Sequence, residues 1–394
     1  MSRAPALSAA ERQRLRDLLA CPTAPYREAA VKRWATARLA AAGVPGCEDR
    51  HGNLIVGCAT LADYRALLRR RNDGPLALLV AHMDHPGFHG VRWLAPDRLA
   101  VRWHGGGPRR HLQRARVWLT VDGQAEFSGR LQQPVLSRDG HALARAEVAL
   151  DAPLPGRRPA ARRLYGGLAF KAPTWRAGHR LYGRVADDLT GVFVVVETAC
   201  ASHRHAAPGQ ALIGLLTRAE EVGFIGMLAH LDDGWLQNAR RPLLGVSLEA
   251  SRNVPGARPG LGPVVRFGDR QGPFSAHGSR LLDRLAAELL PGRYQRKLMD
   301  GGSCEATALL AHGLPAAGLA LPLGNYHNQN FDGGQEAAAA DGPAPEFVDL
   351  RDLAGLLLLC RALATRHWPN DPWAPLRQRL ARRLRAARRT LEAG

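Results

Sequence analysis

A continuous apolar run that ends in polar residues is the feature that most constrains the fold of this chain of 394 residues. Every residue of Leu76–Val80 is apolar, and the sequence Ala-His-Met-Asp-His-Pro-Gly-Phe follows directly. Such a run is typical of a strand buried on both faces, as in the parallel sheets of α/β proteins. Ligands of these sheets bind beyond the carboxyl ends of the strands. We therefore expect an α/β domain with His82 and Asp84 at its functional edge.

Further apolar runs predict the other elements of this domain. Strands are expected at 53–56, 211–216, 243–248, 264–267 and 315–321, and helices at 26–41, 192–201, 279–290 and 350–365. Near the N-terminus, Ser8 and Glu11 have the spacing of a capping box, which predicts that a helix begins there. The alternation of strands and helices predicts a mixed, mostly parallel sheet that is sandwiched by helices.

The pattern of apolar and polar residues changes between about residues 90 and 182. Short alternating segments are separated there by turns rich in Gly, Pro and Arg, and they lie at 98–103, 115–121 and 146–150. This pattern predicts a small all-β module that interrupts the α/β domain. We therefore divide the chain into a first part of the catalytic α/β domain (1–91), an inserted β-barrel-like domain (92–180), a second part of the α/β domain (181–370) and a basic C-terminal helix or tail (371–394).

The chain is strongly basic, with 54 Lys and Arg residues against 35 Asp and Glu residues. Only three of the basic residues are lysines, a skew that often reflects a GC-rich coding sequence. We do not expect a nucleic-acid partner, although a basic protein attracts polyanions. Seven arginines alternate with leucines on a helical pattern between Leu376 and Arg389. A solvated surface helix is the simplest interpretation of this tail, and contact with a partner subunit or an anionic surface is the alternative.

The remaining composition indicates a cytoplasmic enzyme. The six cysteines are scattered and form no CxxC pair, so neither a zinc ribbon nor a redox motif is indicated, and free cysteines suit a reducing compartment. The N-terminal residues lack the apolar region of a signal peptide. No stretch approaches the ~20 apolar residues of a membrane span, so we expect no membrane partner.

Acidic and imidazole residues recur directly after the apolar runs or at the start of a helix. They are His82 with Asp84, Asp187-Asp188, Glu220-Glu221, Glu249 and His327. Each group by itself is ordinary, since such residues usually serve the local structure. Together they suit Zn²⁺, Co²⁺ or Mn²⁺, and they are enough for two ions if one carboxylate bridges them. Two metal ions can hold a hydroxide and polarise a carbonyl, while one carboxylate remains as the general base.

The segments AHMDHPGF, ADDLTG, TRAEEVGFIG and NYH, in this order, resemble the co-catalytic di-zinc aminopeptidases. Within this group the chain most resembles the glutamyl aminopeptidase family, which includes the tetrahedral self-compartmentalising peptidases. The resemblance extends over about residues 20–365. It implies a phosphorylase/hydrolase-like metallopeptidase fold with a β insert, a peptide substrate and a homo-oligomer, for which dimers and dodecamers both stay open.

The resemblance also implies which residues would bind the two divalent ions, for which zinc is the first expectation and cobalt or manganese the alternative. His82 and Glu249 would bind one ion, and Glu221 and His327 would bind the other. Asp187 would bridge both ions.

The same resemblance implies roles for the neighbouring acidic residues. Glu220 would be the general base that takes a proton from the metal-bound water, and Asp84 would orient His82. A cis peptide bond would join Asp187 to Asp188.

The sequence departs from the family at three places. Glu249 stands where the family usually has Asp, and Leu189 stands where Arg often follows the Asp-Asp pair. Residues 300–306 take the place of a Gly-rich Thr-Asp-Ala motif. Their Cys304-Glu305 pair differs from that motif, which leaves recognition of the substrate amine at Glu305 open.

We therefore predict a di-metal aminopeptidase that hydrolyses N-terminal residues of peptides. A related deacylase or carboxypeptidase-type amidohydrolase on the same site is the alternative, and substrate profiling would separate the two. A catalytically inactive, Arg-rich binding protein is a third hypothesis. It would bind nucleic acid in a salt-sensitive manner and would not respond to chelation.

Overall fold

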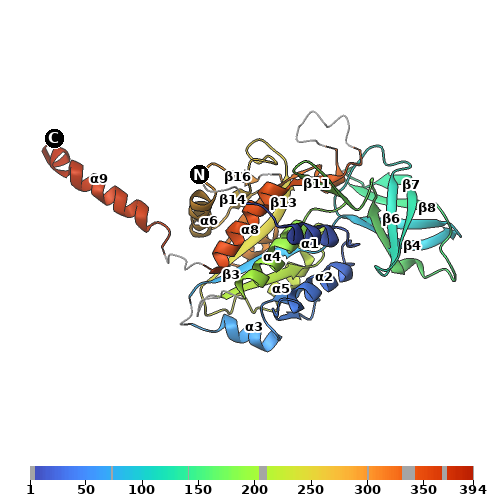
Figure 1. Ribbon diagram of the computed structural model, residues 1–394, viewed down its shortest axis with the longest axis horizontal. Coiled ribbons are helices and arrows are strands. Elements are labelled where there is room, and N and C mark those ends of the chain that lie inside the picture. Colours follow the sequence, from blue (N-terminus) through green and yellow to red (C-terminus); the bar gives the residue numbers. More distant parts are fainter. Residues whose placement is uncertain are drawn as a thin grey trace.

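The computed structural model describes residues 5–71, 74–140, 142–203, 211–299, 301–330, 342–365 and 371–393; Asp300 of the Gly-rich segment lies outside them. These residues form a large mixed sheet with helices on both faces and a small closed β-barrel beside it (Figure 1). The C-terminal helix α9 (Ala374–Ala393) projects away from both units. None of the helices in the described ranges is long and apolar enough to cross a membrane.

The centre of the large sheet consists of four parallel strands in the order β12 (Ala211–Thr217), β3 (Leu76–His82), β13 (Leu243–Arg252) and β17 (Ala316–Gly324). Further strands extend it on both sides: β2 (Leu54–Val56), β1 (Gly46–Glu48), β18 (Glu346–Asp349), β11 (Arg180–Gly183), β10 (Thr174–Ala177), β14 (Val264–Asp269), β15 (Gly272–Pro273) and β16 (Gln295–Met299). Apart from the parallel pair β14–β16, the pairings outside the centre are antiparallel. The expected mostly parallel sheet is therefore not confirmed, because short edge strands can pair through tight connections that parallel strands cannot use.

Helices cover both faces of this sheet. One face carries α1 (Ala9–Leu19), α2 (Ala29–Ala40), α4 (Leu189–Ser202), α6 (Ala276–Leu289) and α8 (Leu350–Thr365), and the other carries α3 (Leu61–Leu68), α5 (Ile225–Asp232) and α7 (Glu305–Ala311). The central strand β3 shares its side chains between the two cores: Leu79 and Ala81 enter the first, whereas Leu76, Leu78 and Val80 enter the second. Because both faces are covered, every residue of β3 is buried, as the apolar run predicted.

The start of the chain shows one prediction that is confirmed and one boundary that differs. The Ser8 hydroxyl accepts a hydrogen bond from the Glu11 backbone N–H, and the Glu11 carboxylate accepts one from the Ser8 backbone N–H, so the capping box is present. The second helix begins at Ala29 rather than at Tyr26. Tyr26 has a φ of 66°, which a right-handed helix does not accommodate.

The inserted segment is a closed barrel with an apolar interior. Its strands neighbour one another in the order β4 (Gly87–Ala95), β5 (Arg98–His104), β8 (Leu143–Leu150), β7 (Glu126–Leu136), β6 (Arg116–Val121) and β9 (Leu164–Leu168). Inward-facing residues such as Phe88, Val117, Leu131 and Val148 form its core. Closure leaves no unpaired edge in this small unit.

The barrel occupies a different range from the insert expected at 92–180. It begins at Gly87 and ends at Leu168, because β10 and β11 pair with each other and then with β18 of the large sheet. A 3₁₀ turn at Ala161–Arg163 also lies in this segment, so an all-β composition is not confirmed. The pairing of β11 with β18, which is distant in sequence, leaves no local pattern, which explains the misplaced boundary.

Glu197 of α4 joins the two N-terminal helices to the core. Its carboxylate accepts hydrogen bonds from the guanidinium groups of Arg14 and Arg38 at 2.6–3.2 Å. Burial alone would raise the pKa of Glu197, but the two arginines hold it below its ordinary value. The ion pairs therefore stabilise the packing of α1 and α2 on α4.

We expect Glu197→Ala to lower the free energy of unfolding by about 3 kcal/mol, since it leaves two partly buried guanidinium groups without their counter-charge. Glu392→Ala, which removes the exposed pair with Arg388 in α9, should change it by less than ~0.5 kcal/mol. Urea unfolding of both variants at pH 7 measures these differences.

The Glu197 effect should also depend on pH. Because its folded pKa lies below the unfolded value, the stabilisation is complete above the unfolded pKa and is lost as pH falls through the folded pKa. An equal difference between wild type and Glu197→Ala at pH 7 and in strong acid would contradict this account.

Candidate metal centre

The residues expected in the site converge on one edge of the large sheet, although they come from distant parts of the sequence. His82 ends β3, the Glu220-Glu221 pair follows β12, and His327 follows β17. Asp187 directly precedes Asp188, which caps the N-terminus of α4. Glu249 lies inside β13, which continues to Arg252, rather than after the strand end as its apolar run suggested.

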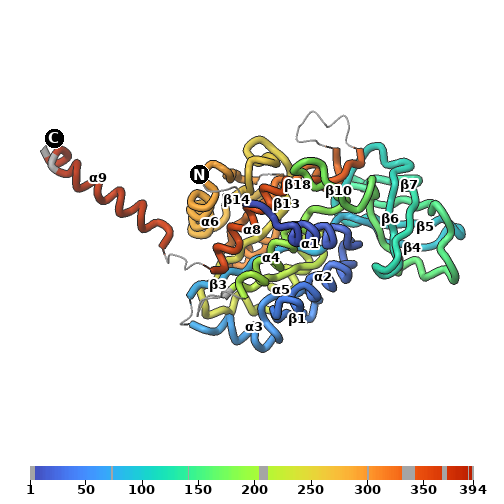
Figure 2. The backbone as a smooth tube through the Cα atoms, in the orientation of Figure 1, coloured from blue at the N-terminus to red at the C-terminus, as the bar shows by residue number. Residues whose placement is uncertain are grey.

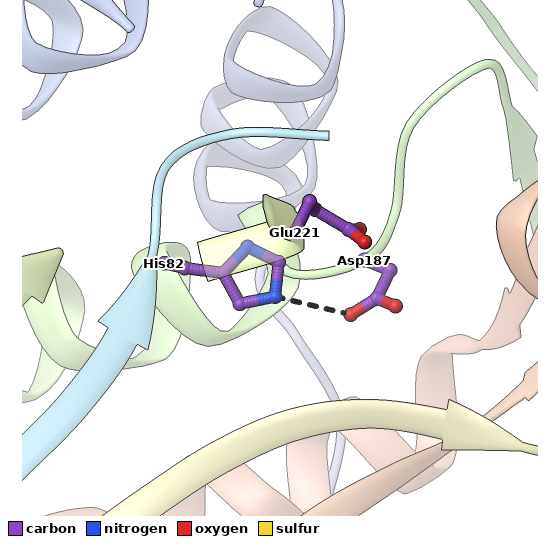
Figure 3. A group of neighbouring side chains, drawn as sticks. All are labelled: His82, Asp187 and Glu221. Carbon is purple, nitrogen blue, oxygen red and sulfur yellow. Dashed lines mark ion pairs between the residues drawn. The ribbon is translucent and has the colours of Figure 1, made fainter. Parts of the chain in front are cut away.

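Asp187 lies between two imidazoles and beside a second carboxylate. Its Oδ1 is 3.6 Å from His82 Nε2, and its Oδ2 is 3.6 Å from His327 Nε2. His327 Nε2 is also 3.0 Å from Glu221 Oε2. Ligand atoms of His82, Asp187 and Glu221 all lie within 4.8 Å of one another (Figure 3). One oxygen of Asp187 thus faces each imidazole, which is the arrangement that a bridging carboxylate requires.

Three further carboxylates lie next to this cluster. Atoms of Glu220, Glu249 and Glu305 also approach within 4.8 Å of one another, and Glu220 Oε2 is 3.7 Å from His82 Nε2. Glu305, the first residue of α7, was not among the predicted site residues. It is fully buried; its Oε1 accepts a hydrogen bond from Thr217 Oγ1, and its Oε2 has no partner in the described chain. Its position in the Gly-rich segment was the only sequence signal for it.

The site holds more buried carboxylates than cations. Burial, reinforced by the neighbouring carboxylates, raises the pKa of Glu220 and that of Glu249 well above the ordinary value. Burial alone would lower the pKa of His82, but Glu220 and Asp187 raise it well above its ordinary value. Buried anions without a counter-charge are costly, so this environment requires additional positive charge.

Unpartnered oxygens show where such charge would bind. Asp187 Oδ1, Glu221 Oε1 and Glu305 Oε2 are buried and accept no hydrogen bond from the described residues. Nitrogen and oxygen donors within 4.8 Å of one another suit a divalent ion such as Zn²⁺, Co²⁺ or Mn²⁺. The residues present therefore fit a metal centre.

Asp84 contacts the site mainly through the backbone N–H groups of Glu220 and Glu221. Its carboxylate accepts hydrogen bonds from the backbone N–H groups of Glu220 and Glu221 at 2.9 and 3.1 Å. Its carbonyl oxygen lies 3.1 Å from His82 Nδ1, whereas its carboxylate is 3.7 Å from that nitrogen. Asp84 therefore contacts both His82 and the Glu-Glu turn, and it fixes the turn through its side chain.

Glu346 connects the backbone around Asp187 with that of His327, and the sequence analysis did not identify it. Its buried carboxylate accepts hydrogen bonds from the backbone N–H groups of Ala186, Asp187 and His327 at 2.7–3.1 Å. The Asp187–Asp188 peptide bond is cis, as the family resemblance implied. No motif marks Glu346, because it lies in β18, between β17 and β11, and reaches the Asp187 backbone across 159 residues of sequence.

The barrel approaches the site through the turn after β5. A Cβ atom added to Gly106 would overlap with Nδ1 of His327, so only glycine allows the main chain to approach the imidazole this closely. The indole N–H of Trp103 donates a hydrogen bond to the Gly106 carbonyl at 2.9 Å and fixes the turn. The ring of Tyr326 stacks on His327 with a centroid distance of 3.7 Å. The barrel turn and Tyr326 therefore both contact the His327 ring.

The mixed sheet with its inserted barrel, and the acidic and imidazole residues at its edge, define an α/β peptidase. Residues 64–331 match the M42 glutamyl aminopeptidase family. The chain belongs to this family.

Solved structures of aminopeptidases share the fold. Aminopeptidase APDkam598 from Desulfurococcus kamchatkensis is 19% identical with a TM-score of 0.69, and the match covers 92% of this chain and 96% of that one. A TET aminopeptidase from a marine sediment archaeon of the Thaumarchaeota is 17% identical with a TM-score of 0.69, covering 91% and 97%. The TET1 peptidase of Pyrococcus horikoshii is 21% identical with a TM-score of 0.66, covering 90% and 99%. No curated protein matches the chain.

We expect Gly106→Ala to displace the His327 ring and to lower zinc affinity on its side of the site by at least tenfold, a loss of ~1.4 kcal/mol. Gly301→Ala is the matched control, since a Cβ at Gly301 meets no atom within 4 Å. Zinc titration of the metal-free protein by calorimetry distinguishes the two. Unchanged zinc binding by Gly106→Ala would show that the barrel turn does not position His327.

Proposed function

We propose that this peptidase is a di-metal aminopeptidase that removes N-terminal residues from peptides. One observation carries the proposal: Asp187 presents one oxygen to His82 and the other to His327, at 3.6 Å each, among buried carboxylates that lack counter-charge. The family to which the chain belongs supports the same activity.

In this proposal each imidazole is paired with a carboxylate around the shared Asp187. His82 and Glu249 hold one divalent ion, and His327 and Glu221 hold the other, with zinc as the first choice and cobalt or manganese as alternatives. Two such ions supply Lewis acidity for the scissile carbonyl and a water nucleophile at neutral pH. Asp84 and Glu346 keep the ligand backbone in place through the hydrogen bonds described above.

Glu220 is the proposed general base. Its backbone is fixed by Asp84, and its Oε2 lies 3.7 Å from His82 Nε2. The buried surroundings that raise its pKa suit a group that accepts a proton from water and later passes it to the leaving amine.

The carboxylate of Glu305 favours an aminopeptidase over the two alternative amidohydrolases. Its Oε2 is buried without a partner beside Glu220 and Glu249, and we propose that it binds the α-ammonium group of the substrate. A charge-assisted hydrogen bond of this kind is stronger than a neutral one. An acylated amine offers no such charge, and the C-terminal carboxylate of a peptide would be repelled by this cluster.

We further propose a cytoplasmic homo-oligomer. The Pyrococcus horikoshii TET1 peptidase is described as assembling into a tetrahedron or a large octahedral shell, and another TET1 structure as a dodecamer. None of the six cysteines, all of which lie in the described ranges, forms a disulfide, which suits a reducing compartment.

We expect Glu220→Gln to lower the turnover of aminoacyl amides by at least ~10³-fold, because the substitution removes the base and keeps the metal ligands. His82→Ala should instead lose bound metal along with activity, and chelation of the wild type should have the same effect. Turnover and elemental analysis of each protein provide the two readouts. Wild-type turnover in Glu220→Gln would refute the assignment of the base.

We expect Glu305→Gln to raise the KM for peptides with a free N-terminus about tenfold or more, while the metal content stays unchanged. Hydrolysis of a peptide and of its N-acetylated form, by wild type and variant, tests this. If wild type releases acetate from the acetylated peptide and does not release the first residue of the free peptide, the deacylase alternative holds in place of the aminopeptidase.

A further inference from the structure

The basic helix α9 takes no part in the peptidase site and lies outside residues 64–331 that match the family. It spans 20 residues, about 30 Å, and projects from the body of the protein (Figure 2). Its base is held by α6: Arg284 donates a hydrogen bond to the Pro372 carbonyl at 3.1 Å, and the Arg280 guanidinium lies 5.2 Å from the centroid of Trp373. The helix thus starts from a fixed point.

Leucines form an apolar stripe along this helix. At ~100° per residue, Leu376, Leu380, Leu384 and Leu391 fall within an arc of about 80°. Leu380, Leu384 and Leu391 are 50, 56 and 73% exposed. Most of the stripe is therefore open to solvent.

Arginines border the leucine stripe on both sides. Arg377 and Arg388 follow it on one side, and Arg379 and Arg383 on the other, by the same helical rotation. The helix carries seven arginines and one glutamate in all. A second α9 packed against this stripe would bring like charges together at the flanking positions, which disfavours pairing between copies. The rest of the chain is also net basic, with 47 Lys and Arg residues against 34 Asp and Glu residues.

We propose that α9 binds the surface of an anionic lipid bilayer. The leucine stripe would enter the boundary between headgroups and acyl chains, and the flanking arginines would contact lipid phosphates; both features are needed for such binding. A nucleic acid would use the arginines but would leave the leucines in water. The expectation of no membrane partner rested on the lack of a spanning segment, and binding at the interface needs none. The proposal does not depend on the peptidase mechanism.

Sedimentation of the full-length protein with vesicles tests the proposal. We expect wild type to pellet with vesicles of phosphatidylcholine and phosphatidylglycerol, less so at high salt, and not with phosphatidylcholine alone. The double variant Leu380→Gln/Leu384→Gln keeps helix propensity and charge but should bind at least ~10-fold more weakly. The matched control Ala381→Gln/Ala386→Gln changes positions off the stripe and should bind as wild type does.

A second variant tests the contribution of the arginines separately from that of the leucines. Arg379→Gln/Arg383→Gln should weaken binding and reduce its salt dependence. Two results would overturn the proposal. One is vesicle binding by Leu380→Gln/Leu384→Gln equal to that of wild type. The other is binding of a 20-nucleotide duplex that is tighter than vesicle binding and is unchanged in this variant. A lower molecular mass of the leucine variant in sedimentation would assign the stripe to a second copy instead. Turnover of a soluble aminoacyl amide, equal in all variants, serves as the folding control.

Discussion

The concentration of buried carboxylates around Asp187 is the constraint on which the rest of this structure depends. Ionised carboxylates in a buried site repel one another unless cations lie between them. Asp187 meets this requirement in part, since each of its oxygens faces an imidazole at 3.6 Å. The unpartnered oxygens of Asp187 and Glu221 account for why we place two divalent ions there.

The parallel strands at the centre of the sheet bring these carboxylate and imidazole groups together. The antiparallel strand β18 and the barrel then hold the groups in position. β3, β12 and β17 each deliver a ligand-type side chain at or just beyond their carboxyl ends, as parallel strands in α/β domains do. Glu346 on the antiparallel strand β18 then ties the backbone of Asp187 to that of His327. The barrel adds a contact from outside the sheet, where the Gly106 turn meets the imidazole of His327. The site is thus built jointly by both units of the protein.

Local patterns in the sequence were sufficient to predict β3, which carries His82, and the start of α1. The apolar run of β3 and the capping box of α1 are confirmed because burial on both faces and a cap are encoded by neighbouring residues. Contacts between distant segments left no such pattern. Glu346 is a site residue only because β18 pairs with β17, and the Gly-rich segment named Glu305 without settling its role. The end of the barrel was misplaced because β10 and β11 pair with a strand of the large sheet that is distant in sequence.

The most direct test of the central claim is anomalous diffraction from crystals of the protein grown with zinc, recorded on both sides of the zinc absorption edge. The account predicts two peaks within bonding distance of Asp187, one beside His82 and Glu249 and one beside His327 and Glu221. A map with no peak at Asp187, or with zinc bound only elsewhere on the chain, would contradict it.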